Sequence, residues 1–155
     1  MKNIKVLWAI ITVLSLILAG IGYQFVVGSV ITAKDGRIAI VLTKGERNFV
    51  LGEMRGLLAN MQQLVSAAAD KDIDKTIRIT KKLIDDSKGA KQLSIIAKTP
   101  INFKRLTNNI HAQFKTLYSD AVEKRDPNHS LKQVSIIMQN CIVCHGAYQL
   151  TELNK

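Results

Sequence analysis

The sequence is poor in proline, glycine, cysteine and aromatic residues. It has two prolines, nine glycines and two cysteines among 155 residues, and aromatic residues make up only 5%. This scarcity, beside many Leu, Ile, Ala, Lys and Gln residues, argues against a β-sandwich or barrel and favours an all-α fold. Two cysteines are too few for a disulfide framework. The length leaves room for one domain and a short additional segment.

Acidic residues are also scarce. The 12 Asp and Glu residues are outnumbered by 22 Lys and Arg residues, which gives a formal net charge of +10. Such a surface attracts an acidic partner protein or anionic headgroups over long range, although a generic solvated basic surface is the alternative. The basic residues are spread along the chain without a nucleic-acid-binding motif, so no nucleic acid partner is expected. We expect no enzyme, because the sequence shows no carboxylate pair, Ser-His arrangement or phosphate loop.

One long apolar run lies near the N-terminus. It extends over residues 6–31, and its clearly polar residues are Thr12, Ser15, Gln24 and Ser29. This length is sufficient to cross a bilayer as a helix. The alternative is a cleaved signal segment, which has a shorter apolar region and ends at small residues spaced like Ala-x-Ala; residues 18–20 and 31–33 match that pattern poorly. We therefore predict a transmembrane anchor over residues 1–33, with Lys2 and Lys5 on the inner side.

The remainder is predicted to form a connector over residues 34–42 and one helical domain over residues 43–155. The apolar stub Ile38–Leu42 is expected to pack against the domain or to extend the next helix, with a brief strand as the alternative. Thr43 and Glu46 form a capping-box pattern, in which two side chains satisfy the free amides at a helix start. A long helix should therefore begin there.

Four amphipathic helices are predicted in the domain from apolar spacings of three and four residues. The breaks between them are expected at 70–72, at 87–98 and at 126–127, with Thr99 as the N-cap of the third helix and Pro100 at its first position. The predicted inner faces are Arg47, Leu51, Met54, Leu58, Met61, Val65 and Ala68; Ile73, Ile77, Thr80 and Ile84; Phe103, Leu106, Ile110, Phe114, Leu117 and Ala121; and Leu131, Val134, Met138, Cys141, His145 and Tyr148. Helices with short connections predict an all-α antiparallel four-helix bundle, preceded by one N-terminal transmembrane helix, with a cofactor site between facing helices.

Both cysteines of the chain lie in the motif Cys141-Ile142-Val143-Cys144-His145. This spacing is that of covalent c-type haem attachment, in which two thiols bind the vinyl groups of one haem and the histidine binds its iron. A thioredoxin-like redox pair needs a preceding strand in a βαβ unit, which the sequence does not indicate. A structural zinc site needs four ligands and usually a second cysteine pair. A structural disulfide would leave the adjacent histidine without a role.

A four-helix domain with this motif on its last helix resembles the cytochrome c prime family. The resemblance covers about residues 43–153, and its specific parts are C-I-V-C-H-G-A-Y over 141–148 and E-R-N-F-V-L-G-E-M over 46–54. It implies that Cys141 and Cys144 hold one haem c and that His145 is the proximal iron ligand. The basic residue that many relatives have four positions after this histidine is replaced here by Gln149.

The resemblance also implies roles for residues of the first helix. Arg47 would lie near a haem propionate, although a solvated surface charge is the alternative, and Leu51 would cover the distal face and leave the iron five-coordinate. Met54 or His111 is the alternative sixth ligand, set against a core methionine and a hydrogen-bonded histidine. Tyr148 is expected to pack on the haem edge or to donate a hydrogen bond nearby.

The sequence thus predicts a single-pass protein of the bacterial inner membrane with its haem domain in the periplasm. We expect a monohaem c-type cytochrome that transfers single electrons to or from a redox partner protein, with its basic surface steering the partner's docking. The first alternative is a five-coordinate haem protein that binds nitric oxide or carbon monoxide as a sensor or buffer. The second is a structural haem subunit of a larger membrane complex. A homodimer is an expectation from the resemblance alone.

Overall fold

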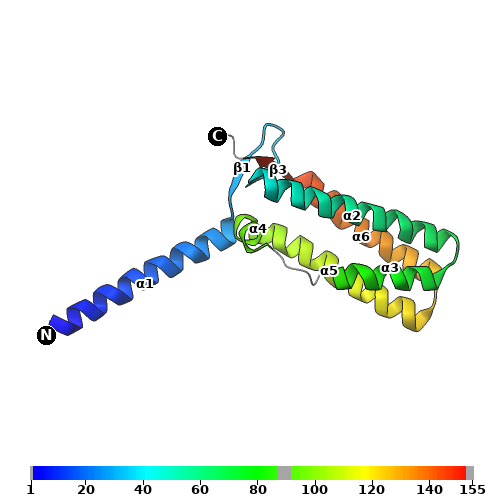
Figure 1. The fold of residues 1–155 in the computed structure, drawn as a ribbon, viewed down its shortest axis with the longest axis horizontal. Helices are drawn as coiled ribbons and strands as arrows, with labels where there is room; N and C mark the ends of the chain where they lie inside the picture. The colour runs from blue at the N-terminus through cyan, green and yellow to red at the C-terminus, as the bar shows by residue number, and fades with distance from the viewer. Residues whose placement is uncertain (1, 87–91, 153–155) are drawn as a thin grey trace.

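The computed structural model describes residues 2–86 and 92–152, which form six helices and three short strands (Figure 1). The predominance of helix agrees with the sequence prediction, whereas the small sheet was not predicted. The elements are α1 Lys2–Val27, β1 Val30–Thr32, β2 Ile38–Leu42, α2 Lys44–Ala69, α3 Ile73–Asp86, α4 Leu93–Lys98, α5 Ile101–Lys124, α6 Pro127–Ala147 and β3 Tyr148–Glu152.

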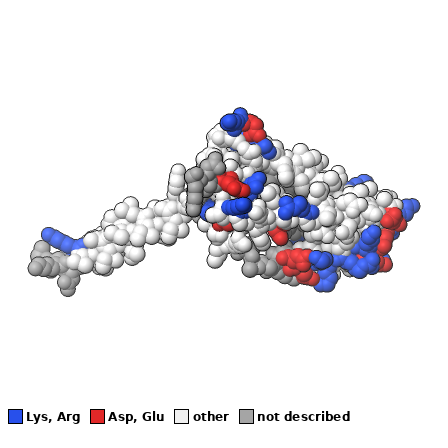
Figure 2. Space-filling view, turned by 45° about the horizontal axis from the view of Figure 1, so that its top comes forward, with Lys and Arg blue, Asp and Glu red and all other residues white. Residues whose placement is uncertain are grey.

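Helix α1 projects away from the rest of the molecule as a single rod (Figure 1). Its stretch Ile4–Val27 is long and apolar enough to cross a membrane, and none of its most apolar window is buried by the protein. Figure 2 shows this rod as almost free of charged side chains beyond its first turns, in contrast to the domain. The helix therefore has the length and composition of the predicted anchor, but it ends at Val27 and the following residues turn into β1.

The three strands form one sheet in the order β1-β2-β3. Strand β2 pairs antiparallel with β1 and parallel with β3, which follows α6 at the other end of the chain. Ile38–Leu42 is therefore the brief strand that was the alternative prediction, and it does not extend the next helix. Its buried residues Ile40 and Leu42 do pack against the domain, as the favoured prediction also allowed. The capping box explains why α2 starts only after this strand, since Thr43 Oγ1 accepts from the Glu46 amide and Glu46 Oε2 accepts from the Thr43 amide.

Helices α2, α3, α5 and α6 lie side by side and contact one another in the pairs α2–α3, α3–α5, α5–α6 and α2–α6 (Figure 1). Each of them contributes side chains to one apolar core near the α2–α3 and α5–α6 connections. Its buried members are Met61, Leu64, Ile79, Phe114, Leu117, Val134 and Ile137. A second apolar cluster joins the sheet to α5 and α6 at the opposite end, and its buried members are Ile40, Leu42, Phe103, Cys144 and Tyr148.

The predicted inner face of the first long helix is only partly correct. Met61 and Ala68 of this face are buried, whereas Leu58 is 69% exposed and Val65 is 40% exposed. Leu64 and Ala67, each one position before a residue of the predicted face, are fully buried. The buried face of α2 therefore lies to one side of the predicted face, because packing against the neighbouring helices decides which side chains are covered.

The inner face of α6 was also predicted in part wrongly. Leu131 and Met138 are exposed, whereas Ser130 and Ile137, one position earlier in each case, are buried. Ser130 tolerates burial because its hydroxyl donates a hydrogen bond to the Asp126 carbonyl.

The inner face of α5 was predicted correctly, with Phe103, Phe114, Leu117 and Ala121 buried. In α3, Ile73 and Thr80 are buried as predicted. Ile77 is only half-buried, and Thr76 and Ile79 are buried instead.

The segment before α5 differs from its prediction. It contains the short helix α4, and Pro100 is the N-cap of α5 in place of Thr99. Thr99 Oγ1 donates instead to the Ile96 carbonyl within the last turn of α4. The predicted end of the second helix at 87–89 lies outside the described residues, and the break at 70–72 is confirmed, with Asp72 Oδ1 accepting from the Lys75 amide at 2.8 Å.

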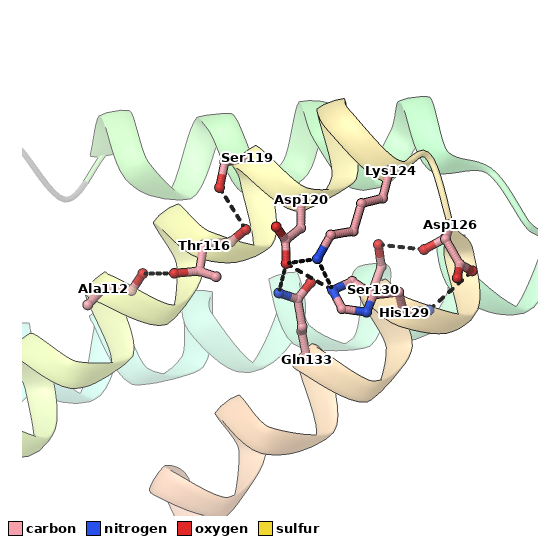
Figure 3. Close-up of polar contacts among 9 residues, drawn as sticks. All are labelled: Ala112, Thr116, Ser119, Asp120, Lys124, Asp126, His129, Ser130 and Gln133. Atoms are coloured by element: carbon pink, nitrogen blue, oxygen red, sulfur yellow. Dashed lines mark hydrogen bonds and ion pairs between the residues drawn. The ribbon is translucent and has the colours of Figure 1, made fainter.

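A polar cluster closes the α5–α6 turn (Figure 3). Asp126 caps α6 by accepting from the amides of Asn128 and His129. Asp120 Oδ2, on α5, accepts from His129 Nε2 at 2.9 Å and from Gln133 Nε2 at 2.7 Å, both on α6. Hydrogen bonds from His129 and Lys124 hold the pKa of Asp120 below its usual value. At this end of the four helices, the hydrogen bonds and ion pairs of Asp120 join α5 to α6 beside the packed apolar core.

Candidate functional site

Two adjoining cavities open at the sheet end of the helical layer. The larger has a volume of about 570 Å³ and is lined by residues of α2, α3, α5 and α6. The smaller has a volume of about 160 Å³ and lies between α2, α5, the end of α6 and the sheet. Four residues line both cavities, namely Met54, Phe103, Cys144 and His145. The larger volume falls within the range of pockets that hold cofactors.

The structure brings all of the sequence-predicted site residues to these two cavities. Those on the smaller cavity are Arg47, Leu51, Met54, Cys144, His145 and Tyr148. Those on the larger cavity are Met54, His111, Cys141, Cys144 and His145. They come from α2, α5, α6 and β3, so segments that are about 100 residues apart in the sequence meet here.

The two cysteines lie in the last turns of α6, and both are free thiols. Burial raises the pKa of each thiol, and for Cys144 the neighbouring Cys141 raises it further. The carboxyl end of a helix carries partial negative charge, which also disfavours a thiolate. Redox-active cysteine pairs need the opposite environment, with a lowered pKa at a helix N-terminus, so this site argues against thiol-disulfide chemistry.

His145 follows on the same last turn of α6. Its side chain is exposed to solvent and also borders both cavities, whereas the sequence prediction placed it on the core side. The difference arises because Cys144, not His145, continues the buried face of Val134 and Ile137. The backbone carbonyl of His145 accepts a hydrogen bond from Arg37 Nη1 at 3.2 Å. The His145 imidazole therefore lies at the edge of both cavities, and the hydrogen bond from Arg37 holds the last turn of α6 in place.

Tyr148 forms part of the floor of the smaller cavity. It was predicted to continue the helix, but it is the first residue of β3 and pairs in register with Ile38 of β2. Its buried ring meets the Phe103 ring edge to face, with centroids 5.4 Å apart and an interplanar angle of 84°. Burial raises the pKa of the Tyr148 hydroxyl, so it stays a neutral hydrogen-bonding group at physiological pH. The strand start thus supplies a rigid aromatic wall beside Cys144.

Helix α2 lines the cavities partly with glycines, which have no side chain. Leu51 and Met54 are only half-buried, and Gly52 and Gly56 line the larger cavity between and beyond them. A Cβ added at Gly56 would meet nothing within 4 Å, and one at Gly52 would meet only the Arg55 guanidinium at 3.9 Å. Each glycine inside a helix costs about 1 kcal/mol relative to alanine. The glycines leave the flat helix backbone accessible to a broad, planar group.

Two arginines border the smaller cavity from different elements. Arg47 on α2 lies 3.4 Å from Glu152 on β3, which is a long and partly exposed ion pair. Arg37 precedes β2 and forms a short pair with Asp35, while its Nη2 donates to Gln149 Oε1 at 2.9 Å. No site role was predicted for Arg37, because its contacts with His145 and Gln149 join residues more than 100 positions apart and leave no local signal in the sequence. Both guanidiniums are positioned to receive an anionic substituent at the mouth of the cavity.

The opposite edge of the larger cavity is polar. His111, on α5, is half-buried there, beside Asn60 of α2. Lys82 and Asp86 of α3 also line this edge and form an ion pair at 2.6 Å. Within the described residues, no three His, Cys, Asp or Glu side chains converge in a way that would hold a metal ion by themselves.

Comparisons of the chain with protein-family models, with curated proteins and with solved structures gave no match. The chemical interpretation of the site rests on its own residues. The two thiols and the imidazole at the end of α6 border the cavities. The other lining residues include Gly52 and Gly56 of α2 and the aromatic rings of Phe103 and Tyr148. The space and its lining suit a large, flat, apolar group with anionic substituents.

Proposed function

We propose that the chain is a membrane-anchored monohaem c-type cytochrome that transfers single electrons and has no enzymatic activity of its own. The observation that supports this most strongly is that Cys141, Cys144 and His145, in the spacing of haem attachment, all border one cavity of about 570 Å³. When bound, haem supplies an iron that alternates between two oxidation states. The chain supplies attachment, orientation and the exclusion of water.

Cys141 and Cys144 would hold the haem through two thioethers. In each, the sulfur forms a bond to a vinyl carbon and the thiol hydrogen ends on the neighbouring carbon, so no oxidant is consumed. The neutral state of both thiols favours this addition over disulfide formation. His145 would bind the iron through its imidazole, and Arg37 would fix its position through the backbone carbonyl.

The neighbouring residues have complementary roles in this proposal. Arg47 and Arg37, which border the smaller cavity, would offset the charge of the propionates, and Tyr148 with Phe103 would provide an aromatic packing surface for the ring. Helices α2, α3, α5 and α6 would form the antiparallel four-helix bundle that resembles the cytochrome c prime family. The helix pairs in contact and the late position of the motif support that assignment.

Three residues that line the cavities bear on the choice between two functions. Leu51 and Met54 both line the smaller cavity together with His145, and His111 lies on the larger one. If Leu51 covered the free side of the haem, the chain would offer the iron no second ligand, and a small diatomic molecule such as nitric oxide or carbon monoxide could bind. If Met54 or His111 served as a second protein ligand, the site would suit electron transfer. The apolar space beside Leu51 keeps gas binding as the second candidate function.

The location follows from the anchor and the chemistry together. We place α1 in a bacterial inner membrane and the haem domain in the periplasm, where c-type haem is attached. The single apolar helix supports the anchor. A redox partner with an acidic docking surface would be steered by the net charge of +10, and less so at high salt.

The test is an optical and electron paramagnetic resonance spectrum of the detergent-solubilised chain, oxidised and reduced, with and without carbon monoxide. A haem protein with a protein-derived sixth ligand would be low-spin and resist carbon monoxide, which supports electron transfer. A high-spin iron that binds carbon monoxide supports the gas-binding function with Leu51 as distal cover. A chain that shows no haem absorbance after production beside an active haem-attachment system would refute both functions.

A further inference from the structure

The junction between α1 and the folded domain is made of direct contacts. Gly28 ends the helix with φ +73°, a conformation that favours glycine, and a Cβ there would lie 2.5 Å from the Lys98 carbonyl oxygen. The next amide, that of Ser29, donates to the same carbonyl at 2.7 Å. The backbone of α1 therefore touches the end of α4 without an intervening linker.

Side chains extend this contact back along the last turn of α1. Gln24 Nε2 donates to the Ala97 carbonyl at 3.4 Å. Lys104 Nζ, on α5, donates to the Phe25 carbonyl at 2.6 Å and lies 3.5 Å from the centre of the Phe25 ring. Helix α4 and the start of α5 thus lie level with the last turn of the apolar helix (Figure 1).

The depth of this turn in a bilayer follows from helix geometry. The apolar stretch Ile4–Val27 has 24 residues, which span about 36 Å at 1.5 Å per residue. The hydrocarbon core of a bilayer is about 30 Å thick. The last turn therefore reaches the headgroup region, where the polar groups of Gln24 and Lys104 are well solvated. Elements packed beside this turn lie at the same depth.

Helix α4 presents the apolar side chain of Leu93 outward. Leu93 is 81% exposed, the largest exposed fraction among the large apolar side chains of the described residues. Since α4 has six residues and is about 9 Å long, Leu93 lies roughly within 10 Å of the point where α1 leaves the membrane. Ile31 on β1, three residues after Gly28, is 56% exposed in the same region. Exposure of these two apolar side chains to water costs free energy, and insertion at the nearby bilayer boundary would remove them from water.

We propose that α4 is an interfacial helix that lies on the bilayer beside α1 and inserts Leu93 at the boundary between headgroups and acyl chains. The occupant of this surface is the lipid bilayer itself, and the inference rests on α1 spanning that bilayer. The domain is then held in one orientation by α1 and α4 together, and the cavities face a fixed direction relative to the membrane. A redox partner would approach from that direction alone.

Tryptophan quenching by brominated phosphatidylcholine tests the proposal in the full-length protein reconstituted into vesicles. Trp8 is the only tryptophan of the chain, so Trp8→Phe provides a silent background. On that background, Leu93→Trp probes α4, and Val122→Trp is the matched control, since Val122 is 47% exposed near the far end of α5. We expect the Leu93→Trp emission to fall by about half and that of Val122→Trp to stay unchanged.

Equal emission changes for Leu93→Trp and Val122→Trp would overturn the proposal. The unsubstituted protein provides the reference, because Trp8 lies inside the apolar stretch and should be quenched by the same lipid. Quenching of Trp8 without quenching of Leu93→Trp would refute the docking of α4 and leave the anchor intact. An unquenched Trp8 would refute the anchor, and this inference with it. Neither result bears on haem attachment, which is read from the haem spectrum.

Discussion

The end of the helical layer at the α5–α6 turn is filled, whereas the end at the sheet is hollow. At the filled end Leu64 and Leu117 are fully buried, and the polar cluster around Asp120 closes the turn above them. At the hollow end Leu51 and Met54 are only half-buried, and the larger cavity has a volume of about 570 Å³. The same four helices thus form a packed core at one end and a cavity at the other.

Helix α2 shows the difference within a single element. Its second half carries the buried residues Met61, Leu64, Ala67 and Ala68, and its first half carries the glycines Gly45, Gly52 and Gly56. Close packing is the normal state of a protein interior, and an unfilled apolar space forfeits dispersion contacts. We infer that the filled end stabilises the fold, while the hollow end gives up stability that a bound cofactor restores. The predictions below test that division.

Replacing Cys141 and Cys144 together by serine should have the largest effect, because it removes both attachment points at the hollow end. We expect complete loss of covalently bound haem, measured as haem absorbance that stays with the chain on a denaturing gel. Helical content should be retained, because the filled end is untouched. The control is Ile142→Ser with Val143→Ser, since these side chains are 72% and 56% exposed. Haem that persists on the cysteine-free chain would contradict the division.

Leu64→Ala should destabilise the filled end by about 3 kcal/mol, since it leaves a cavity in a closed core. The matched control is Leu58→Ala on the same helix, which should cost less than about 0.5 kcal/mol because Leu58 is 69% exposed. Denaturant unfolding of the solubilised chain, followed by circular dichroism, measures both. Similar costs for the two leucines would show that the filled end is not the source of stability.

Glu46→Gln should cost roughly 2 kcal/mol, because Glu46 is buried and accepts from Lys98 Nζ at 2.6 Å as well as capping α2. The bond from Lys98 lowers the pKa of Glu46 from 4.5 to about 2. The ionised pair therefore stabilises the fold above pH 4.5, and this contribution is lost as the pH falls toward 2.

Unfolding free energies measured between neutral pH and pH 3 check this prediction. The variant should show a flatter dependence on pH than the wild type over the acidic range. Lys82→Gln is the control, because its ion pair with Asp86 joins side chains that are 68% and 59% exposed. An exposed pair of this kind contributes between about 0 and 1 kcal/mol. Parallel curves for wild type and Glu46→Gln would show that the Glu46–Lys98 pair does not stabilise the hollow end.

Gly56→Ala should have the smallest effect and the opposite sign. The added methyl group would enter open space, and alanine is preferred over glycine inside a helix by about 1 kcal/mol. We expect the haem-free chain to become more stable by roughly 0.5 to 1 kcal/mol in denaturant unfolding. Gly28→Ala is the contrasting control, since its Cβ would clash with the Lys98 carbonyl and destabilise the chain. A destabilised Gly56→Ala variant would mean that other atoms already fill the space beside Gly56.

The features that the sequence predicted correctly are encoded locally. The capping box at Thr43 and Glu46 needs only four consecutive residues, and the break between the last two long helices at Asp126 and Pro127 needs two. The spacing of the cysteines and of His145 is likewise local, and it placed the motif on the last helix. Such signals depend on short-range hydrogen bonds and backbone restrictions, so the rest of the fold does not change their meaning.

The features that the sequence did not predict depend on long-range contacts. Strand β2 is stabilised by a partner about 110 residues away, and Arg37 reaches His145 and Gln149 over a similar separation. The phase of α2 was wrong for Leu58 and Val65, because the neighbouring helices decide which face is buried. The raised pKa of Cys144 follows from burial, which only the folded chain determines. The cysteine motif and wall residues such as Leu51 and Tyr148 could thus be predicted from the sequence, whereas the sheet and the contacts of Arg37 could not.

The central claim is that the hollow end holds a covalently attached haem. The most direct measurement is the intact mass of the denatured full-length chain, produced in cells with an active system for c-type haem attachment. The account predicts a chain heavier by one haem, with haem absorbance that stays with the polypeptide after extraction with acidified acetone. A chain with the mass of the bare polypeptide and two titratable thiols would contradict it.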